Sequence, residues 1–344
     1  MAAPSAKAPL AAVLGCAGPR LDGDERRFFR DADPLGFILF QRNCQDPDQV
    51  RALVADLRDA VGRADAPVLI DQEGGRVARL KPPHWRAAPP AADFCRLFKR
   101  DPDRGVEAMA LNARLLAAEL ADLGITVDCA PVLDLPRPDG DPVIGDRACG
   151  DTPETAALLG RTQAEGLMAG GVLPVIKHVP GHGRATVDSH AALPVVRAPR
   201  SELEATDFAP FKALADMPWA MTAHVVYTAI DPDRPATLSP EVIADVIRGH
   251  MGFDGVLVSD DLSMGALSGG LGNRAGDCLA AGCDLALHCN GDRTEMAAVA
   301  AGCRPLDAAG LARVARGAAR LPGAPAPFDR DAAARRLAAL LEAA

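Results

Sequence analysis

Aromatic residues are scarce in this sequence, because Phe, Trp and Tyr together make up only 4% of its 344 residues. Hydrophobic residues still reach 49% and charged residues 24%, which is ordinary for a soluble globular protein. The core must therefore be built mainly from Ala, Val, Leu and Ile. No linker, charge block or low-complexity segment divides the chain, so we predict a single domain over residues 1–344.

The chain also lacks a net positive charge and long apolar runs. The formal net charge of -9 argues against nonspecific binding to nucleic acid or to anionic membrane. No apolar run approaches the roughly 20 residues that span a bilayer. The apolar segment from Pro9 to Ala17 contains a Leu-Gly-Cys sequence that resembles a bacterial lipoprotein cleavage site, but it is short and follows only one basic residue, Lys7. We therefore predict a first β-strand there.

Paired cysteines and familiar nucleophile motifs are missing as well. The nine cysteines are odd in number and form no CxxC pair, so we predict reduced core residues in a cytoplasmic protein. Neither Ser189 nor Ser263 has the glycine-flanked elbow of a serine hydrolase, and no P-loop is present.

An apolar run followed by a helical stretch recurs along the chain. The eight runs are Leu10–Ala17, Gly36–Phe40, Val68–Ile70, Ile125–Leu133, Leu173–Ile176, Trp219–Ala223, Gly255–Val258 and Asp284–His288. Eight strands alternating with helices predict a parallel sheet, and this number favours a closed (β/α)₈ TIM-type barrel. A doubly wound open sheet is the alternative, but no Gly-rich fingerprint follows the first strand.

Several helices have readable start signals. Residues 46–49, Asp-Pro-Asp-Gln, combine an N-cap, a first-turn proline and a reach-back glutamine. Ser201 and Glu204 predict a capping box, and Ser239 followed by proline predicts another helix start. Residues 329–344 are predicted to form a final helix.

Ionisable side chains stand where the predicted strands end. They are Asp71, Asp134, Lys177, His178, His224, Asp260, Asp261 and His288. In a TIM barrel the carboxyl ends of the strands form the catalytic face. We therefore expect these groups to lie around one site.

The stretch from Leu173 to His190 is the strongest candidate for that site. A short apolar run leads into a loop, marked by Pro180, Gly181 and Gly183, that carries several ionisable residues. Within it, Asp188 lies two residues from His190, so its carboxylate can hydrogen-bond that imidazole. Such a pair suits a general acid/base near neutral pH, although an isolated Asp–His pair is more often a surface feature without a role.

The same loop raises a metal interpretation. His178 and His182 have H-x-x-x-H spacing, which binds zinc when both lie on one helix face, and Asp188 could supply a third ligand. Pro180 and Gly181 exclude that helix, but loops can also bind metals. In the alternative interpretation, His182 braces the loop by hydrogen bonding to its backbone.

Two further segments carry carboxylates at strand ends. Asp260 comes directly off its strand and is the predicted reactive group, whereas Asp261 could cap the next helix. After the third strand, Asp71 and Arg79 flank a Gly-Gly turn. They either bind a polyhydroxylated ligand or are solvated charges of that turn.

Together these motifs resemble glycoside hydrolase family 3, specifically its compact bacterial cytoplasmic β-N-acetylglucosaminidases of peptidoglycan recycling. The matching segments, in the family's order, are residues 71–77 (DQEGGRV), 177–183 (KHVPGHG), 188–190 (DSH), 221–224 (MTAH) and 259–264 (SDDLSM). The resemblance covers essentially the whole chain.

The resemblance implies a role for each matching residue. Asp260 resembles the catalytic nucleophile, and His190 resembles the acid/base with Asp188 as its partner. The residues that resemble the family's sugar-binding set are Asp71, Arg79, Arg147, Lys177 and His178. We expect His182, His224 and Met264 to line the site as well.

The sequence departs from the family at two places. Val179 replaces the usual Phe, a change that should affect packing and not chemistry. Ala148 and Cys149 follow Arg147 where the family has Ser and an aromatic residue, which leaves the position of the Arg147 loop open.

The implied activity is that of a retaining exo-β-N-acetylglucosaminidase. It would remove terminal N-acetylglucosamine from GlcNAc-1,6-anhydroMurNAc-peptides in the cytoplasm, as a monomer, without cofactor or metal and without binding nucleic acid or membrane. Phosphorolysis is an alternative, because a neutral histidine repels an anionic acceptor less than a carboxylate does. The same residues are also compatible with a metal-dependent barrel hydrolase and with a non-enzymatic carbohydrate-binding protein.

Overall fold

The computed structural model describes residues 8–323 and 326–342, and its centre is a closed barrel of eight parallel strands. In chain order these strands are β1 (Leu10–Leu14), β2 (Pro34–Leu39), β3 (Val68–Ile70), β4 (Val127–Asp128), β5 (Leu173–Val179), β7 (Trp219–Thr222), β10 (Val256–Asp261) and β11 (Leu285–His288). Each overlaps one of the eight predicted runs. The predicted TIM-type barrel is confirmed, and the open doubly wound sheet is wrong.

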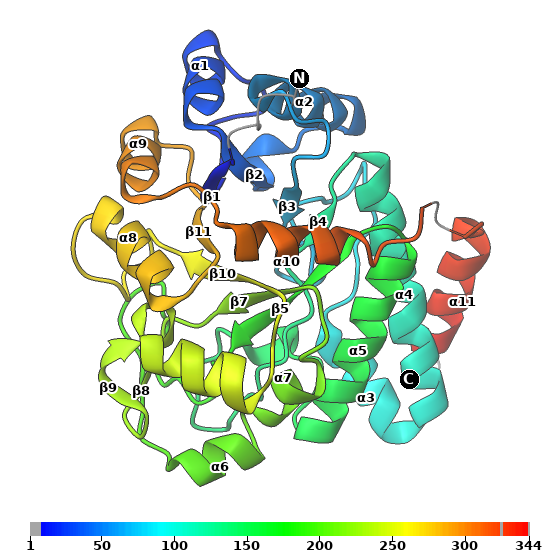
Figure 1. Cartoon of the computed structure of the whole chain (residues 1–344). Helices are drawn as coiled ribbons and strands as arrows, with labels where there is room; N and C mark the ends of the chain where they lie inside the picture. The colour runs from blue at the N-terminus through cyan, green and yellow to red at the C-terminus, as the bar shows by residue number, and fades with distance from the viewer. Residues whose placement is uncertain (1–7, 324–325, 343–344) are drawn as a thin grey trace.

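Helices surround the barrel, as Figure 1 shows. They are α1 (Gly23–Ala32), α2 (Pro47–Val61), α3 (Ala91–Arg100), α4 (Pro102–Asp122), α5 (Pro153–Ala169), α6 (Arg200–Ala205), α7 (Ala209–Ala213), α8 (Leu271–Ala281), α9 (Arg293–Gly302), α10 (Ala308–Ala318) and α11 (Arg330–Glu342). A π-helix spans Val242–His250. A small sheet of β6 (Val195–Val196), β8 (Val226–Tyr227) and β9 (Asp231–Pro235) stands beside the barrel.

The predicted starts of two helices are confirmed. The Asp46 carboxylate accepts the Gln49 N–H at 2.9 Å at the start of α2. The Ser239 hydroxyl accepts the Val242 N–H at 3.1 Å, where the π-helix begins. The predicted final helix is also present as α11, with residues 343–344 outside the described part of the chain.

The predicted capping box at Ser201 is wrong. Helix α6 begins at Arg200, directly after Pro199 and two residues before the start that a Ser201 cap would give, and it has no side-chain cap. A proline has no backbone N–H and is suited to a helix entrance, so the helix starts from it directly. Glu204 accepts instead from Arg200 at 2.7 Å along the same helix.

The fourth strand is much shorter than predicted, because β4 comprises only Val127–Asp128. The Ala130 N–H turns back to the Asp128 carbonyl at 2.8 Å, and Pro131 has no N–H to donate to the neighbouring strand. Pairing resumes only as an isolated bridge between Val132 and Lys177. The chain still delivers Asp134, fully buried, to the carboxyl end of the barrel.

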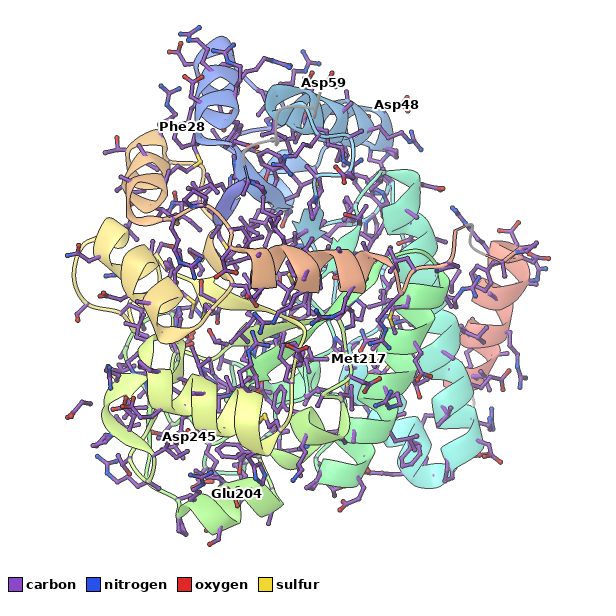
Figure 2. The ribbon with its side chains drawn as sticks, viewed as in Figure 1. Phe28, Asp48, Asp59, Glu204, Met217 and Asp245 are labelled. Carbon is purple, nitrogen blue, oxygen red and sulfur yellow. The ribbon has the colours of Figure 1, made fainter. Side chains whose placement is uncertain are left out.

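The two ends of the barrel are covered differently. Helix α10 crosses the strands in Figure 1 and lies over the amino end, where the Arg316 guanidinium donates to the Asp254 carbonyl at 2.8 Å just before β10. Figure 2 shows Asp48 and Asp59 of α2 on the outer surface, whereas Met217, just before β7, is buried. The carboxyl end is left to the loops that build the candidate site.

The core between the barrel and its helices is packed mainly with aliphatic side chains, as expected from the low aromatic content. Trp219 at the start of β7 is the largest fully buried side chain, and most of the other core residues are aliphatic. All nine cysteines are free, and seven of them are buried, as predicted. Among residues 8–323 and 326–342, no helix is long and apolar enough to cross a membrane.

Candidate active site

A cavity of about 460 Å³ opens at the carboxyl ends of the strands. It is lined by ten of the predicted site residues, which are Asp71, Arg79, Arg147, Lys177, His178, His182, Asp188, His190, Asp260 and Met264. Side chains from β5 and β10 and from the loops after β3, β4, β5 and β10 therefore meet in one hollow. His224 is the predicted residue that does not reach the cavity wall.

Asp71, just after β3, is held by two cations. The Lys177 ammonium of β5 lies 2.8 Å from one of its oxygens, and the Arg79 guanidinium lies 3.1 Å from the other. Burial raises the pKa of Asp71, but Lys177 and Arg79 outweigh it and hold the pKa well below the usual range. The carboxylate is therefore charged at any physiological pH and can accept hydrogen bonds from sugar hydroxyls.

Phe40 supports the guanidinium of this group and was not predicted from the sequence. The Arg79 guanidinium lies 4.6 Å from the centre of the Phe40 ring, a cation–π geometry that fixes a long, flexible side chain. Phe40 also lines the cavity. No local pattern marked it, because the contact joins the end of β2 to the loop after β3.

Glu73 is a second buried carboxylate that sequence reasoning missed as a site residue. It accepts a two-pronged hydrogen bond from Arg147, at 2.8 Å to each oxygen, and lies 2.7 Å from the Lys177 ammonium. Burial raises the pKa of Glu73, but the charges of Lys177 and Arg147 outweigh burial and the net shift is downward. Glu73 therefore stays ionised. Its position two residues after Asp71 in the DQEGGRV segment was the available signal.

This pairing fixes the Arg147 loop. The Arg147 side chain is only 10% exposed and lines the cavity. Burial lowers the pKa of Arg147, but the neighbouring Glu73 carboxylate raises it more, so the net shift is upward. Glu73 thus places the guanidinium in the site, even though Ala148 and Cys149 replace the family's usual residues after it.

Asp134 organises the two histidines of the loop after β5. It accepts His178 Nδ1–H at 2.7 Å and the His182 backbone N–H at 2.6 Å. Burial raises the pKa of Asp134, but the His178 imidazole outweighs it and the net shift is downward. With Nδ1 engaged by a carboxylate, Nε2 of His178 is the atom left to meet a ligand.

His182 braces the loop through a side chain and not through the backbone contact proposed from the sequence. Its Nε2 lies 3.0 Å from the Ser189 hydroxyl, which ties the start of the loop to the segment just before His190. Burial lowers the pKa of His182 to about 4. The ring is therefore neutral at physiological pH and acts as a hydrogen-bonding brace.

Asp188 and His190 form the predicted pair. One Asp188 oxygen accepts both His190 Nδ1–H at 2.7 Å and the His190 backbone N–H at 2.9 Å. Burial raises the pKa of Asp188, but the His190 N–H groups outweigh it, so the net shift is downward. His190 Nε2 is then the atom free to exchange protons with a ligand, and the imidazole is 65% exposed.

Asp260 and Asp261 divide their roles at the end of β10. Asp261 accepts the Ser263 N–H at 3.0 Å, the Ser263 hydroxyl at 2.7 Å and the Cys289 N–H at 3.2 Å, so it holds the following turn. Asp260 accepts the Asp261 N–H at 2.8 Å and faces the cavity.

Asp260 is ionised in spite of its burial. Burial raises its pKa, but the His178 imidazole and the Asp261 N–H outweigh this effect and lower the pKa. The Asp260 carboxylate is anionic, lies at the carboxyl end of β10 and is held by the Asp261 N–H. Such a carboxylate can stabilise a developing positive charge or attack an electrophilic carbon.

His224 lies behind the cavity and supports β10. Its Nε2–H donates to the Asp261 carbonyl at 3.0 Å, and its Nδ1 lies 2.7 Å from the Thr237 hydroxyl oxygen. Burial lowers the pKa of His224, which keeps the ring neutral. The expectation that it lines the site is wrong, because both of its nitrogens are used to fix the strand end.

The proposed metal ligands are each bonded elsewhere. His178 pairs with Asp134, His182 with Ser189, and Asp188 with His190. Within residues 8–323 and 326–342 no three His, Cys, Asp or Glu side chains are grouped closely enough to hold a metal ion. The donor set therefore does not fit the zinc interpretation of the H-x-x-x-H spacing.

This chain is similar to known proteins over most of its length. Residues 18–318 match the family described as Glycosyl hydrolase family 3 N terminal domain. A protein of Alkalilimnicola ehrlichii named Beta-hexosaminidase is 42% identical over 285 residues, which is 81% of this chain and 80% of the relative. A protein of the same name from Methylococcus capsulatus is 41% identical, over 79% of this chain and 80% of the relative.

Solved structures resemble the whole fold. The crystal structure of NagZ from Neisseria gonorrhoeae in complex with N-trifluoroacetyl-D-glucosamine has a TM-score of 0.87 and 32% identity, and covers 97% of this chain and 99% of that chain. A glycoside hydrolase family 3 beta-N-acetylglucosaminidase from Paenibacillus has a TM-score of 0.79 and 34% identity, over 96% of this chain. This chain spans only 61% of the Paenibacillus chain.

Proposed function

The chain belongs to glycosyl hydrolase family 3, and we propose that it cleaves β-N-acetylglucosaminides with retention of configuration, using Asp260 as nucleophile and His190 as acid/base. It is a glycoside hydrolase of the β-N-acetylhexosaminidase type. The observation that carries the residue assignment is that Asp260 and the Asp188–His190 pair line the same cavity, together with the sugar-binding candidates Asp71 and Lys177.

The first step forms a covalent intermediate. The Asp260 carboxylate attacks the anomeric carbon, and the bond from that carbon to the glycosidic oxygen breaks. The protonated His190 gives its Nε2 proton to the departing oxygen, so the aglycone leaves as an alcohol. The Asp188 carboxylate on Nδ1 stabilises the imidazolium that donates this proton.

The second step restores the enzyme. Neutral His190 accepts a proton from an incoming water while the water oxygen attacks the anomeric carbon. The ester bond to Asp260 breaks, and the carboxylate is regenerated. Two displacements at one carbon give net retention.

The charged groups around Asp71 and Glu73 would hold the sugar. Asp71 can accept hydrogen bonds from two neighbouring hydroxyls, and Lys177 and Arg147 can donate to hydroxyl oxygens. These four side chains are fixed to one another before any ligand arrives. Preorganisation of this kind lowers the entropy cost of placing the anomeric carbon.

For the natural substrate we propose GlcNAc-1,6-anhydroMurNAc-peptides, cleaved in the cytoplasm by a monomer. The substrate rests on the resemblance of the 177–183 and 188–190 segments to the peptidoglycan-recycling group. Nine free cysteines support a reducing compartment. A product profile from such fragments, with and without inorganic phosphate, tests both the substrate and the acceptor: a sugar 1-phosphate would identify phosphorolysis.

The mechanism is tested by two substitutions. Asp260→Ala should abolish nitrophenol release from a nitrophenyl β-N-acetylglucosaminide, and near-normal turnover would contradict the nucleophile assignment. His190→Ala should slow substrates with poor leaving groups far more than activated ones, because only poor leaving groups need a proton. Equal slowing of both would contradict its role as the acid.

A further inference from the structure

The turn that follows the nucleophile is hydrogen-bonded directly to the segment that carries the acid/base. The Gly265 N–H donates to the His190 carbonyl at 3.0 Å, and the Ala266 N–H donates to the Ser189 carbonyl at 3.1 Å. These two bonds join the loop after β10 to the loop after β5. They connect the two catalytic candidates by the backbone alone.

The donor side of this contact is held firmly. Asp261 accepts from Ser263, and the Met264 N–H donates to the Asp261 carbonyl at 3.1 Å. The Arg274 guanidinium of α8 donates to the Leu262 carbonyl at 2.7 Å. The turn from residue 261 to residue 266 is thus a fixed platform at the end of β10.

The segment that accepts these two bonds, residues 188–190, has few other contacts that fix His190. The Asp188 and His190 side chains are 39% and 65% exposed, so packing contributes little to their position. The Asp188–His190 hydrogen bonds are internal to the segment and do not attach it to the barrel. The Ser189 hydroxyl on His182 provides one attachment, and the two backbone bonds from the platform provide the others.

The contact requires glycine at position 265. A Cβ built there would lie 2.8 Å from the His190 carbonyl oxygen and 3.0 Å from the Ala191 carbonyl oxygen. Both are backbone atoms, which cannot swing aside as a side chain can. Gly265 does not have a left-handed φ angle. Glycine is therefore required by the lack of space for a side chain and not by the backbone conformation.

We propose that Gly265 is a positioning residue, whose missing side chain and backbone N–H set His190 at its working distance from Asp260. This rests on the proposed function, because it presumes that His190 is the acid/base. Any larger residue would push the His190 carbonyl outward by roughly half an ångström, which is the tolerance within which catalytic groups act. The imidazole would then be displaced relative to the glycosidic oxygen while Asp260 keeps its place on β10.

The test compares Gly265→Ala with Gly270→Ala. At Gly270, five residues further on, a built Cβ meets no heavy atom of the described chain within 4 Å. Each variant is assayed on aryl β-N-acetylglucosaminides with leaving groups from 2,4-dinitrophenol, which needs no proton, to phenol, which does. We expect Gly265→Ala to lower kcat/KM at least tenfold for the phenyl substrate and less than about threefold for the dinitrophenyl substrate. Gly270→Ala should match the native protein throughout.

Two outcomes would overturn the proposal: native-like rates for Gly265→Ala across the series, or equal slowing across the series, which would indicate a general structural role. His190→Ala in the same series distinguishes failure of the Gly265 proposal from failure of the proposed function. If the rates of His190→Ala do not depend on the leaving group more than those of the native protein, the acid/base assignment itself is refuted. If Gly265→Ala does not fold, amide hydrogen exchange of the native protein decides. Protected N–H groups at 265 and 266 support the contact, and exchange at the unprotected rate contradicts it.

Discussion

Replacing Glu73 by Gln should both destabilise the protein and weaken the site, because Glu73 is the buried partner of two cations. It accepts two hydrogen bonds of 2.8 Å from Arg147 and lies 2.7 Å from Lys177, and its side chain is only 5% exposed. In Gln, an amide NH₂ would face donors where a carboxylate oxygen now accepts. Removing one partner of a buried charge pair costs about 3–5 kcal/mol.

Asp146→Asn is the matched control for this prediction. The Arg76–Asp146 pair has a similar length, 2.9 Å, but both side chains are more than 40% exposed. An exposed pair contributes only about 0–1 kcal/mol. In thermal unfolding, we expect the Glu73 variant to lose about 5 °C or more and the Asp146 variant less than about 2 °C.

The pH dependence has a definite sign. The pKa of Glu73 is lowered in the folded protein, so its contribution to stability is present above the unfolded pKa and is lost as pH falls through the folded pKa. The Gln variant should therefore lose less stability than the native protein as the pH falls from about 5 towards 3. It should also lose at least tenfold in kcat/KM, because Arg147 loses its anchor. Equal melting temperatures for the two variants would refute the role of the buried network.

Three further predictions concern the loop and the chemistry. Asp188→Asn should slow the phenyl substrate more than the dinitrophenyl substrate, because the His190 imidazole loses the carboxylate that orients it; equal slowing of both substrates would argue against the pair. Ser189→Ala removes the hydroxyl bonded to His182 and should cost about 1–3 kcal/mol in denaturant unfolding, whereas Thr186→Ala on the exposed part of the same loop should be neutral. Activity should survive prolonged treatment with a chelator, and loss of activity that added zinc restores would favour the metal-dependent hydrolase.

Much of the fold could be predicted from the sequence because strand and loop patterns are local. The run from Leu173 to Ile176 and the Pro-Gly interruption after it identify a buried strand and a loop without any tertiary information. The fourth strand could not be bounded, because Pro131 interrupts the strand pairing inside a run of mainly apolar residues. Ser201 was misassigned because serine caps are recognised by pattern, and the pattern did not account for Pro199.

The site was predictable where chemistry-bearing residues fall in recognisable motifs. Glu73 and Phe40 were missed because their importance lies in contacts with residues distant in sequence, Arg147 and Arg79. His224 was misplaced for the converse reason: its motif predicts a site residue, but the structure turns both ring nitrogens to Thr237 and the Asp261 carbonyl. Only the folded chain distinguishes a side chain in the cavity from one behind it.

The assignment of Asp260 as the nucleophile can be measured directly with a 5-fluoro N-acetylglucosaminyl fluoride, which forms the covalent intermediate and hydrolyses slowly. Mass spectrometry of the digested protein should locate the sugar on the peptide that contains Asp260, and NMR of ordinary turnover should show the β-anomer of N-acetylglucosamine as the first product. Label on another carboxylate, or the α-anomer appearing first, would contradict the account.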